Sequence, residues 1–151
     1  MQKLLYTMHF KGRMSSSASG SSSLRTTGSA TSCVVTTTIC QEGVQSDVRP
    51  SQGGLAFLDS ELRVTGAGSF QEDGTVAFGE DGEHILRFSS IGQGHLASSL
   101  EPGTMAGTAT CNIDGGAGQF AAACGFITSN FTLTDTGDFD DFHTVLIFLP
   151  E

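Results

Sequence analysis

Four histidines are the residues of this chain whose chemistry is easiest to define, because an imidazole gains and loses a proton near neutral pH. His84 and His143 lie in stretches that are expected to be β-strands, where a side chain can face an interior. There an imidazole could move a proton to or from an enol or an epoxide. His9 and His95 are expected to be exposed to water. For His84, a hydrogen-bonded structural histidine is the competing interpretation.

An acidic run, Asp135–Asp141, is the one segment that suggests a metal, because closely spaced aspartates around a glycine turn often bind calcium. Its spacing matches no established calcium loop, and a hairpin also needs polar turn residues. We expect no metal here. The segment Ile91–His95 contains Gly-x-Gly but lies between strands, and the chain has no Gly-x-Ser-x-Gly or phosphate loop. We therefore expect no cofactor.

The charge balance excludes some partners. Seven Lys and Arg against sixteen Asp and Glu give a net charge of -9, which repels nucleic acid and anionic membrane surfaces. No apolar run is long enough to span a membrane, and Leu4–Phe10 lacks the small-residue cleavage site of a secretory signal. We expect a cytoplasmic protein. Its cysteines are expected to be buried thiols, and they are Cys33, Cys40, Cys111 and Cys124.

The composition favours strands and turns, with 20 Gly and no Trp in 151 residues. We expect one domain, 1–151, and eight strands. Residues 15–32, rich in Ser and Gly, are expected to form a long flexible loop or a lid. Asp73-Gly74 and Asp81-Gly82 are expected to be hairpin turns. The predicted strands are 3–11, 32–40, 54–65, 75–79, 83–91, 104–113, 125–134 and 142–149.

Alternation along the strands predicts which side chains face inward, because a barrel without covering helices turns its apolar face to the interior. Leu58, Leu62 and Val64 are expected inside, so Asp59, Glu61 and Arg63 form a solvated outer face. Leu86 and Phe88 carry His84 to the interior with them. The residues expected to contact a ligand there are Tyr6, Met8, Leu58, Leu62, Phe88, Ser90, Met105, Cys111, Ser129 and Phe131.

The last strand is apolar on both faces, with Phe142, Leu146 and Phe148 opposite Val145 and Ile147 among others. One face is expected to meet the interior and the other a partner subunit. The sequence therefore predicts a homo-oligomer.

Two glycine-rich motifs carry a family resemblance. Gly103-Thr-Met-Ala-Gly107 precedes a strand end, and Gly115-Gly-Ala-Gly-Gln-Phe-Ala-Ala-Ala-Cys-Gly125 precedes the closing strands. Over about the last seventy residues this pattern resembles barrels of the allene oxide cyclase and dirigent type, including small bacterial barrel families. The resemblance implies an all-β fold, a single eight-stranded antiparallel barrel of calycin-like form.

The resemblance further implies an apolar lumen that cyclises or couples a small molecule without a cofactor. The acid expected on the first strand of the plant cyclases has no counterpart here, and neither do the lumen charges of dirigent proteins, so no residue role is transferred. We expect a barrel that binds an apolar or polyketide-like molecule and acts as an isomerase or cyclase. The alternatives are a carrier without catalysis and a structural barrel filled by Phe57, Phe78, Phe88 and Phe131.

Overall fold

The computed structural model describes residues 1–18, 20 and 22–151, and most of them lie in strands of one antiparallel sheet. In chain order the elements are β1 Gln2–Ser16, β2 Ser23–Cys40, β3 Gly43–Gly66, β4 Ser69–Phe78, β5 His84–Ser90, β6 Gly94–Ser98, β7 Thr104–Ala117, the 3-10 turn η1 Gly118–Phe120, β8 Cys124–Thr134 and β9 Asp138–Leu149. The prediction of an all-β chain is confirmed.

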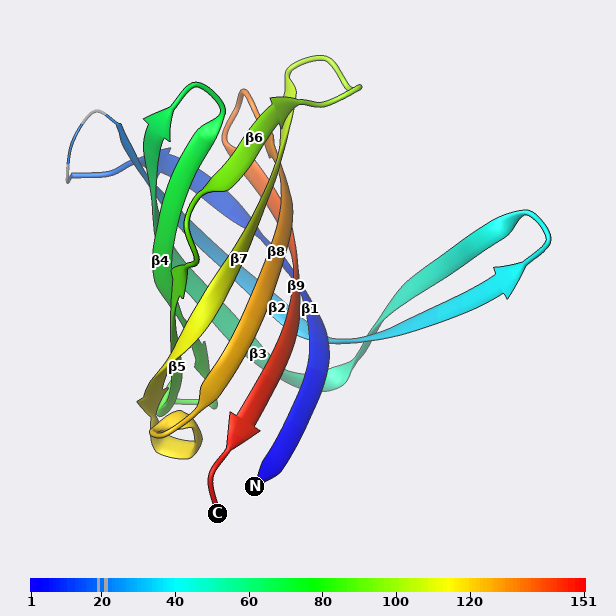
Figure 1. Cartoon of the computed structure of the whole chain (residues 1–151), viewed down its shortest axis with the longest axis vertical. Helices are drawn as coiled ribbons and strands as arrows, with labels where there is room; N and C mark the ends of the chain where they lie inside the picture. Colours follow the sequence, from blue (N-terminus) through cyan, green and yellow to red (C-terminus); the bar gives the residue numbers. More distant parts are fainter. Residues whose placement is uncertain (19, 21) are drawn as a thin grey trace.

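The sheet closes on itself (Figure 1). Its order is β3-β2-β1-β9-β8-β7-β5-β4, and β4 pairs with β3 again. β5 and β6 share one place in this ring, since each pairs with β4 and with β7. The ring therefore has eight strand positions, as the sequence predicts, and β6 is an addition that the sequence reading missed.

Alternation along the strands fills the ring with apolar side chains. On β3, Leu58 and Leu62 are buried, while Asp59 and Arg63 point outward and pair with Arg25 and Asp73. The predicted solvated face is confirmed. Val64 is 41 % exposed and Phe57 is 50 % exposed, so both predictions that placed them inside are wrong. Phe57 has the opposite parity to Leu58, and Val64 lies near the strand end.

Two glycines are needed where aromatic rings lie flat against neighbouring strands. A Cβ added to Gly107 would lie 2.2 Å from the Phe131 ring, and one added to Gly94 would lie 2.3 Å from the Phe70 ring. Phe70 and Phe131 also contact each other, with ring centroids 5.7 Å apart. These glycines leave room for an aromatic cluster that fills one end of the ring.

Two turn predictions need correction. Residues 15–32 are largely strand, because β1 continues to Ser16 and β2 begins at Ser23; Ser19 and Ser21 lie outside the described residues. Asp73-Gly74 lies inside β4, where Gly74 packs against Ser60 of β3. In both places the polar composition that suggested a turn belongs to strands that pair within the ring. The turn at Asp81-Gly82 is confirmed, with Gly82 at φ 65°.

A two-stranded ribbon, here called the arm, projects from the ring (Figure 1). It consists of Cys33–Cys40 of β2 and Gly43–Pro50 of β3, paired from Cys33 and Pro50 outward. At its base the register shifts, since Thr31 pairs with Leu55 and Cys33 with Pro50. The strand predicted at 32–40 therefore exists, but it lies almost entirely outside the ring.

Candidate functional site

A layer of polar side chains crosses the middle of the ring interior. On β9, Asp141 and His143 point inward and are at most 1 % exposed. The Nε2 atom of His143 lies 2.7 Å from an Asp141 oxygen, and the Ser129 hydroxyl of β8 donates to both Asp141 oxygens, at 2.9 and 3.0 Å. Neighbouring strands thus hold the carboxylate and the imidazole in one fixed arrangement.

Glu72 brings a second carboxyl group into this layer from β4. The Ser60 hydroxyl donates to Glu72 at 2.7 Å, and the Glu72 backbone N–H donates to the Ser90 hydroxyl at 2.9 Å. Burial raises the pKa of Glu72 to about 7; the Ser60 hydrogen bond opposes that shift, and the Asp141 carboxylate adds to it. Near neutral pH this group is poised between its acid and its base form.

His143 is enclosed by two aromatic rings. Phe10 and Phe88 contact it edge-on, with centroids 5.0 and 6.1 Å away. This burial works against a charged imidazole, but the nearby Asp141 carboxylate, its hydrogen bond and the Glu72 carboxylate outweigh it and raise the pKa of His143. The raised pKa favours the protonated imidazole beside its carboxylate partner.

Two further polar groups border the layer. Cys111 is fully buried, and burial followed by the Glu72 and Asp141 carboxylates raises its pKa to about 12, so it remains a thiol. Thr26, directly opposite Ser60 on β2, has a buried hydroxyl with no hydrogen-bond partner among the described residues. Such a hydroxyl is an acceptor and donor available to a small bound molecule.

A cavity of about 440 Å³ opens in the wall where the arm leaves the ring. The pairing of β1 with β2 begins only at Met8 and Ser32, so the residues of β1 before Met8 are not paired with β2 in the sheet. The wall of the cavity combines residues of the ring with residues from the base of the arm. The lining residues are Tyr6, Thr7, Met8, Ser32, Cys33, Gly54, Leu55, Ala56, Phe78 and Gly79.

Met8 connects this cavity to the polar layer. It lines the cavity and lies directly opposite His143 in the pairing of β1 with β9. Tyr6 and Phe78 form an edge-on pair at 6.5 Å on the same wall. Burial raises the pKa of the Tyr6 phenol far above its usual value, so the phenol stays neutral and can donate or accept a hydrogen bond.

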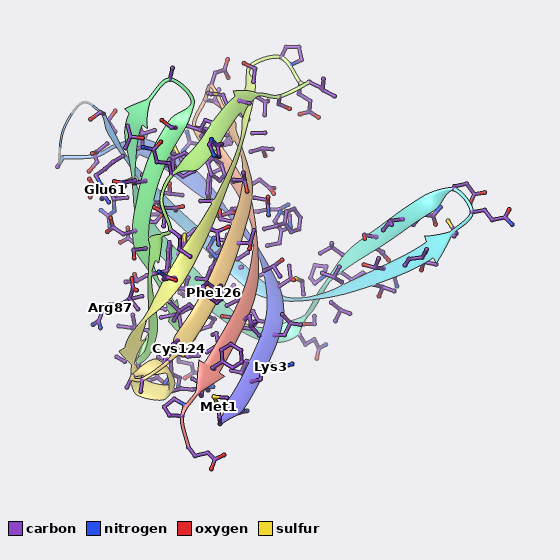
Figure 2. The ribbon with its side chains drawn as sticks, viewed as in Figure 1. Met1, Lys3, Glu61, Arg87, Cys124 and Phe126 are labelled. Carbon is purple, nitrogen blue, oxygen red and sulfur yellow. The ribbon has the colours of Figure 1, made fainter. Side chains whose placement is uncertain are left out.

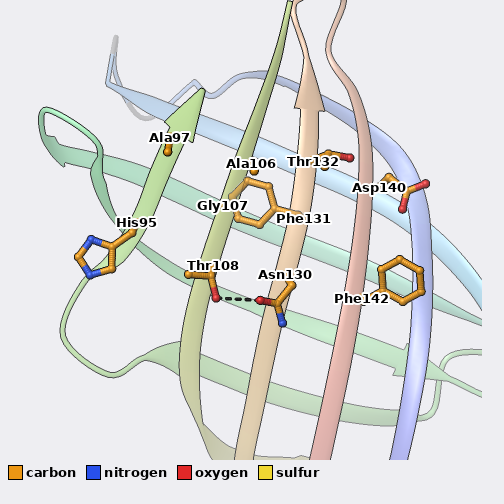
Figure 3. A pocket seen from close by; sticks show the side chains of 10 residues that line it. All are labelled: His95, Ala97, Ala106, Gly107, Thr108, Asn130, Phe131, Thr132, Asp140 and Phe142. Carbon is orange, nitrogen blue, oxygen red and sulfur yellow. Dashed lines mark hydrogen bonds between the residues drawn. The ribbon is translucent and has the colours of Figure 1, made fainter. Parts of the chain in front are cut away.

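A second hollow, of about 450 Å³, lies on the outside of the ring over β6 to β9 (Figure 3). Thr108 and Asn130, joined by a hydrogen bond of 3.0 Å, have the opposite parity to the buried Ala109 and Ser129. His95 lies at its edge, exposed to water as predicted. The polar layer is separated from this hollow by the wall of the ring.

The structure separates the two predicted catalytic histidines. His143 lies in the layer, whereas His84 lies at the rim, where its side chain is 37 % exposed and its Nδ1 accepts the Gln119 N–H at 3.1 Å. His84 keeps the inward parity of Leu86 and Phe88, but it is the first residue of β5 and lies partly exposed beside η1, so it does not join the polar layer as predicted. Met105, 39 % exposed near the start of β7, is not an interior residue.

The other predicted ligand contacts fall into two groups. Tyr6 and Met8 line the wall cavity. The remaining residues are buried or half-buried in the ring, around or below the polar layer, and are Leu58, Leu62, Phe88, Ser90, Cys111, Ser129 and Phe131.

Sequence reasoning missed Asp141 and Glu72, which it assigned to turn regions. The parity of β9 could have identified Asp141, because it is two residues before His143 and two after the buried Phe139. Within the described part of the chain, no group of three or more His, Cys, Asp or Glu side chains is placed to hold a metal ion.

The cysteines are all free, but their burial differs from the prediction. Only Cys111 is buried; Cys33 and Cys40 are half-buried and Cys124 is exposed on β8 (Figure 2). Among the described residues there is no helix of the length and apolar character needed to cross a membrane. Comparisons with known protein families, with curated proteins and with solved structures each find no match to this chain.

Proposed function

We propose that this protein is a small-molecule-binding β-barrel of the allene oxide cyclase-like kind, whose ligand enters through the wall cavity beside the arm. The observation that carries the proposal is the cavity of about 440 Å³, walled by Tyr6, Met8 and Phe78, which adjoins the polar layer at Met8. An apolar pocket with a few polar groups at its inner end is the usual form of a small-molecule site. The ligand expected is apolar or polyketide-like.

The polar layer supports a second candidate, cofactor-free isomerisation or cyclisation. His143, whose protonated form is favoured by the adjoining Asp141 carboxylate, would donate a proton to a ligand carbonyl or epoxide oxygen. Glu72, with its pKa of about 7, would take up the proton released from carbon, so the step is balanced without a cofactor. The Met8 side chain must move aside for a ligand to reach His143. A carrier would use the cavity alone, and we propose the cytoplasm as the setting for either role.

Binding can be tested with the protein's own fluorescence. The chain has one Tyr and no Trp, and this Tyr6 lies in the cavity wall. Titration with the neutral apolar dye N-phenyl-1-naphthylamine is expected to quench Tyr6 and to saturate. Ala56→Leu, which narrows the cavity, should weaken binding at least tenfold. Ala106→Leu in the outer hollow is the matched control and should leave it unchanged.

Catalysis needs a separate readout. With a medium-chain ketone such as 2-decanone in D2O, wild-type protein is expected to accelerate exchange of the protons next to the carbonyl, followed by NMR. His143→Gln should abolish the exchange while dye binding survives. Saturable binding without exchange in the wild type would identify a carrier. The absence of both binding and exchange would leave a structural barrel with a filled interior.

A further inference from the structure

The arm is amphipathic, and its pairing register shows how. Directly opposite residues of an antiparallel ribbon lie on the same face. Val35 pairs with Val48 and Ile39 with Val44, whereas the other face carries pairs such as Thr38 with Gln45. The face here called the apolar face comprises Cys33, Val35, Thr37, Ile39, Val44, Ser46, Val48 and Pro50.

Much of this apolar face lies in water. Ile39 is 83 % exposed and Val44 is 69 % exposed, at the end of the arm far from the ring. An isolated two-stranded ribbon is marginally stable in water and needs a surface to pack against. Nothing else in the described chain covers the outer part of the arm (Figure 1). The face is therefore expected to be covered by another molecule.

The order of residues along the apolar face is symmetric. A hydrophobic pair, Val35 with Val48, is followed by the polar pair Thr37 and Ser46, whose hydroxyls lie 3.2 Å apart, and then by Ile39 with Val44. Rotating one arm by 180° about the polar pair places each hydrophobic pair against the other hydrophobic pair. A two-fold contact between copies requires this kind of self-complementary surface.

The base of the arm supplies a hollow for the partner's tip. A cavity of about 590 Å³ lies between the arm and the ring, and it includes Val48, Pro50, Leu55 and Phe142. Each arm strand has eight residues beyond the ring, a length of roughly 26 Å at about 3.3 Å per residue. Two arms that overlap fully would therefore bring each tip to the base of the other.

We propose that two copies of this chain dimerise through their arms, apolar face to apolar face, about a two-fold axis at Thr37 and Ser46. Each tip, with Ile39 and Val44, then packs against Val35 and Val48 of the other copy and reaches the hollow at the arm base. The two sites adjoin, since Cys33 and Leu55 line both the wall cavity and the hollow at the arm base. The residues tested below, Thr37 and Ile39, do not line the wall cavity.

The size of this contact sets its strength. The apolar face and the rest of the hollow supply about fifteen residues per copy, or roughly 500 Å² per partner at the usual area per interface residue. The total of about 1,000 Å² is at the lower limit for a specific interface. Each chain also carries a net charge of -9. The dimer is therefore weak, and added salt strengthens it by screening the repulsion.

Sedimentation velocity over a range of protein and salt concentrations tests the dimer. Wild-type protein is expected to show a monomer–dimer equilibrium that shifts toward dimer as NaCl rises. Ile39→Asp should raise the dissociation constant at least about tenfold, because it places a charge in the apolar contact of both halves. Thr38→Asp is the matched control, with the same added charge on the polar face, and should change the constant less than about twofold.

Cross-linking locates the axis. In a background with Cys33→Ser, Cys40→Ser and Cys124→Ser, the variant Thr37→Cys is expected to form a disulfide-linked dimer on mild oxidation, and Gln45→Cys on the polar face is not. Unchanged circular dichroism shows that each variant is folded. A wild-type chain that stays monomeric at high protein and salt concentrations overturns the proposal. So does a dimer that Ile39→Asp leaves intact, which would place the contact on another surface.

Discussion

The ring and the arm share the strands β2 and β3, but the ring buries side chains that face its interior and the arm leaves its side chains in water. β2 and β3 run from one region into the other, with a shift in their pairing register at the base of the arm. Inside the ring, buried polar groups such as Asp141 and Glu72 have partners within hydrogen-bond distance. On the arm, Ile39 and Val44 are exposed. The comparison teaches that closure of the sheet, rather than strand composition, decides which residues are protected from water.

The largest effect is expected from breaking the buried pair. Asp141→Leu leaves the His143 charge and the Ser129 hydroxyl without their partner, and should lower the free energy of unfolding by about 3 to 5 kcal/mol in urea denaturation. The double variant Asp141→Leu/His143→Leu removes both charges and should recover most of this loss. If the single variant is as stable as the wild type, the Asp141–His143 pair does not contribute to the free energy of unfolding.

The next effect is a pH dependence of stability. Because the pKa of Glu72 rises from about 4.5 in the unfolded chain to about 7 on folding, its contribution is fully present below pH 4.5 and is lost as pH rises through 7. The loss is about 3 kcal/mol by this linkage. The raised pKa of His143 acts in the same direction. Stability measured by urea denaturation should therefore fall from pH 5 to pH 8.

Glu72→Gln provides the check on that assignment. The amide cannot ionise, so the variant should match wild type near pH 5, exceed its stability at pH 8, and show a flatter profile between them. A profile that keeps the wild-type slope would assign the titration to other groups of the layer, such as His143.

A smaller effect is expected at the packed end of the ring. Gly107→Ala puts a methyl group where the Phe131 ring lies, and this overpacking should cost about 1 to 3 kcal/mol in thermal or urea denaturation. In a Phe131→Leu background the same substitution should cost much less, because the ring is gone. Equal costs in both backgrounds would contradict the role given to this contact.

The smallest effect on the ring is expected from removing the arm. Cys33 and Pro50 face each other in register, so the segment 34–49 can be replaced by Asn-Gly, which suits a two-residue hairpin turn. Thermal unfolding of the monomer should stay within a few degrees of wild type, since the arm adds nothing to the ring core. A large loss of stability would show instead that the arm supports the ring.

Some features follow from local sequence. The parity of Leu58 and Leu62 against Asp59 and Arg63 is enough to place their side chains, because successive strand residues point to opposite faces. Asp81-Gly82 is sufficient for its turn, since glycine accepts a positive φ. These features depend only on neighbours along the chain, and the structure confirms them. Alternation did not decide the face of His143, because the last strand is apolar on both faces.

Other features appear only when the ring closes. Glu72 and Asp141 lie on β4 and β9, which are not adjacent in the sheet, so their shared layer depends on the whole circuit of strands. Burial then raises the pKa of Glu72, a shift that no local pattern encodes. The departure of the arm is equally hidden, because the residues 33–40 are rich in Val, Thr and Ile, as any strand is. Sequence by itself determined the all-β class and the faces of segments with clear alternation, such as Leu58 to Arg63. The tertiary structure decided the strand limits and which faces meet, because burial and pairing depend on contacts between distant segments.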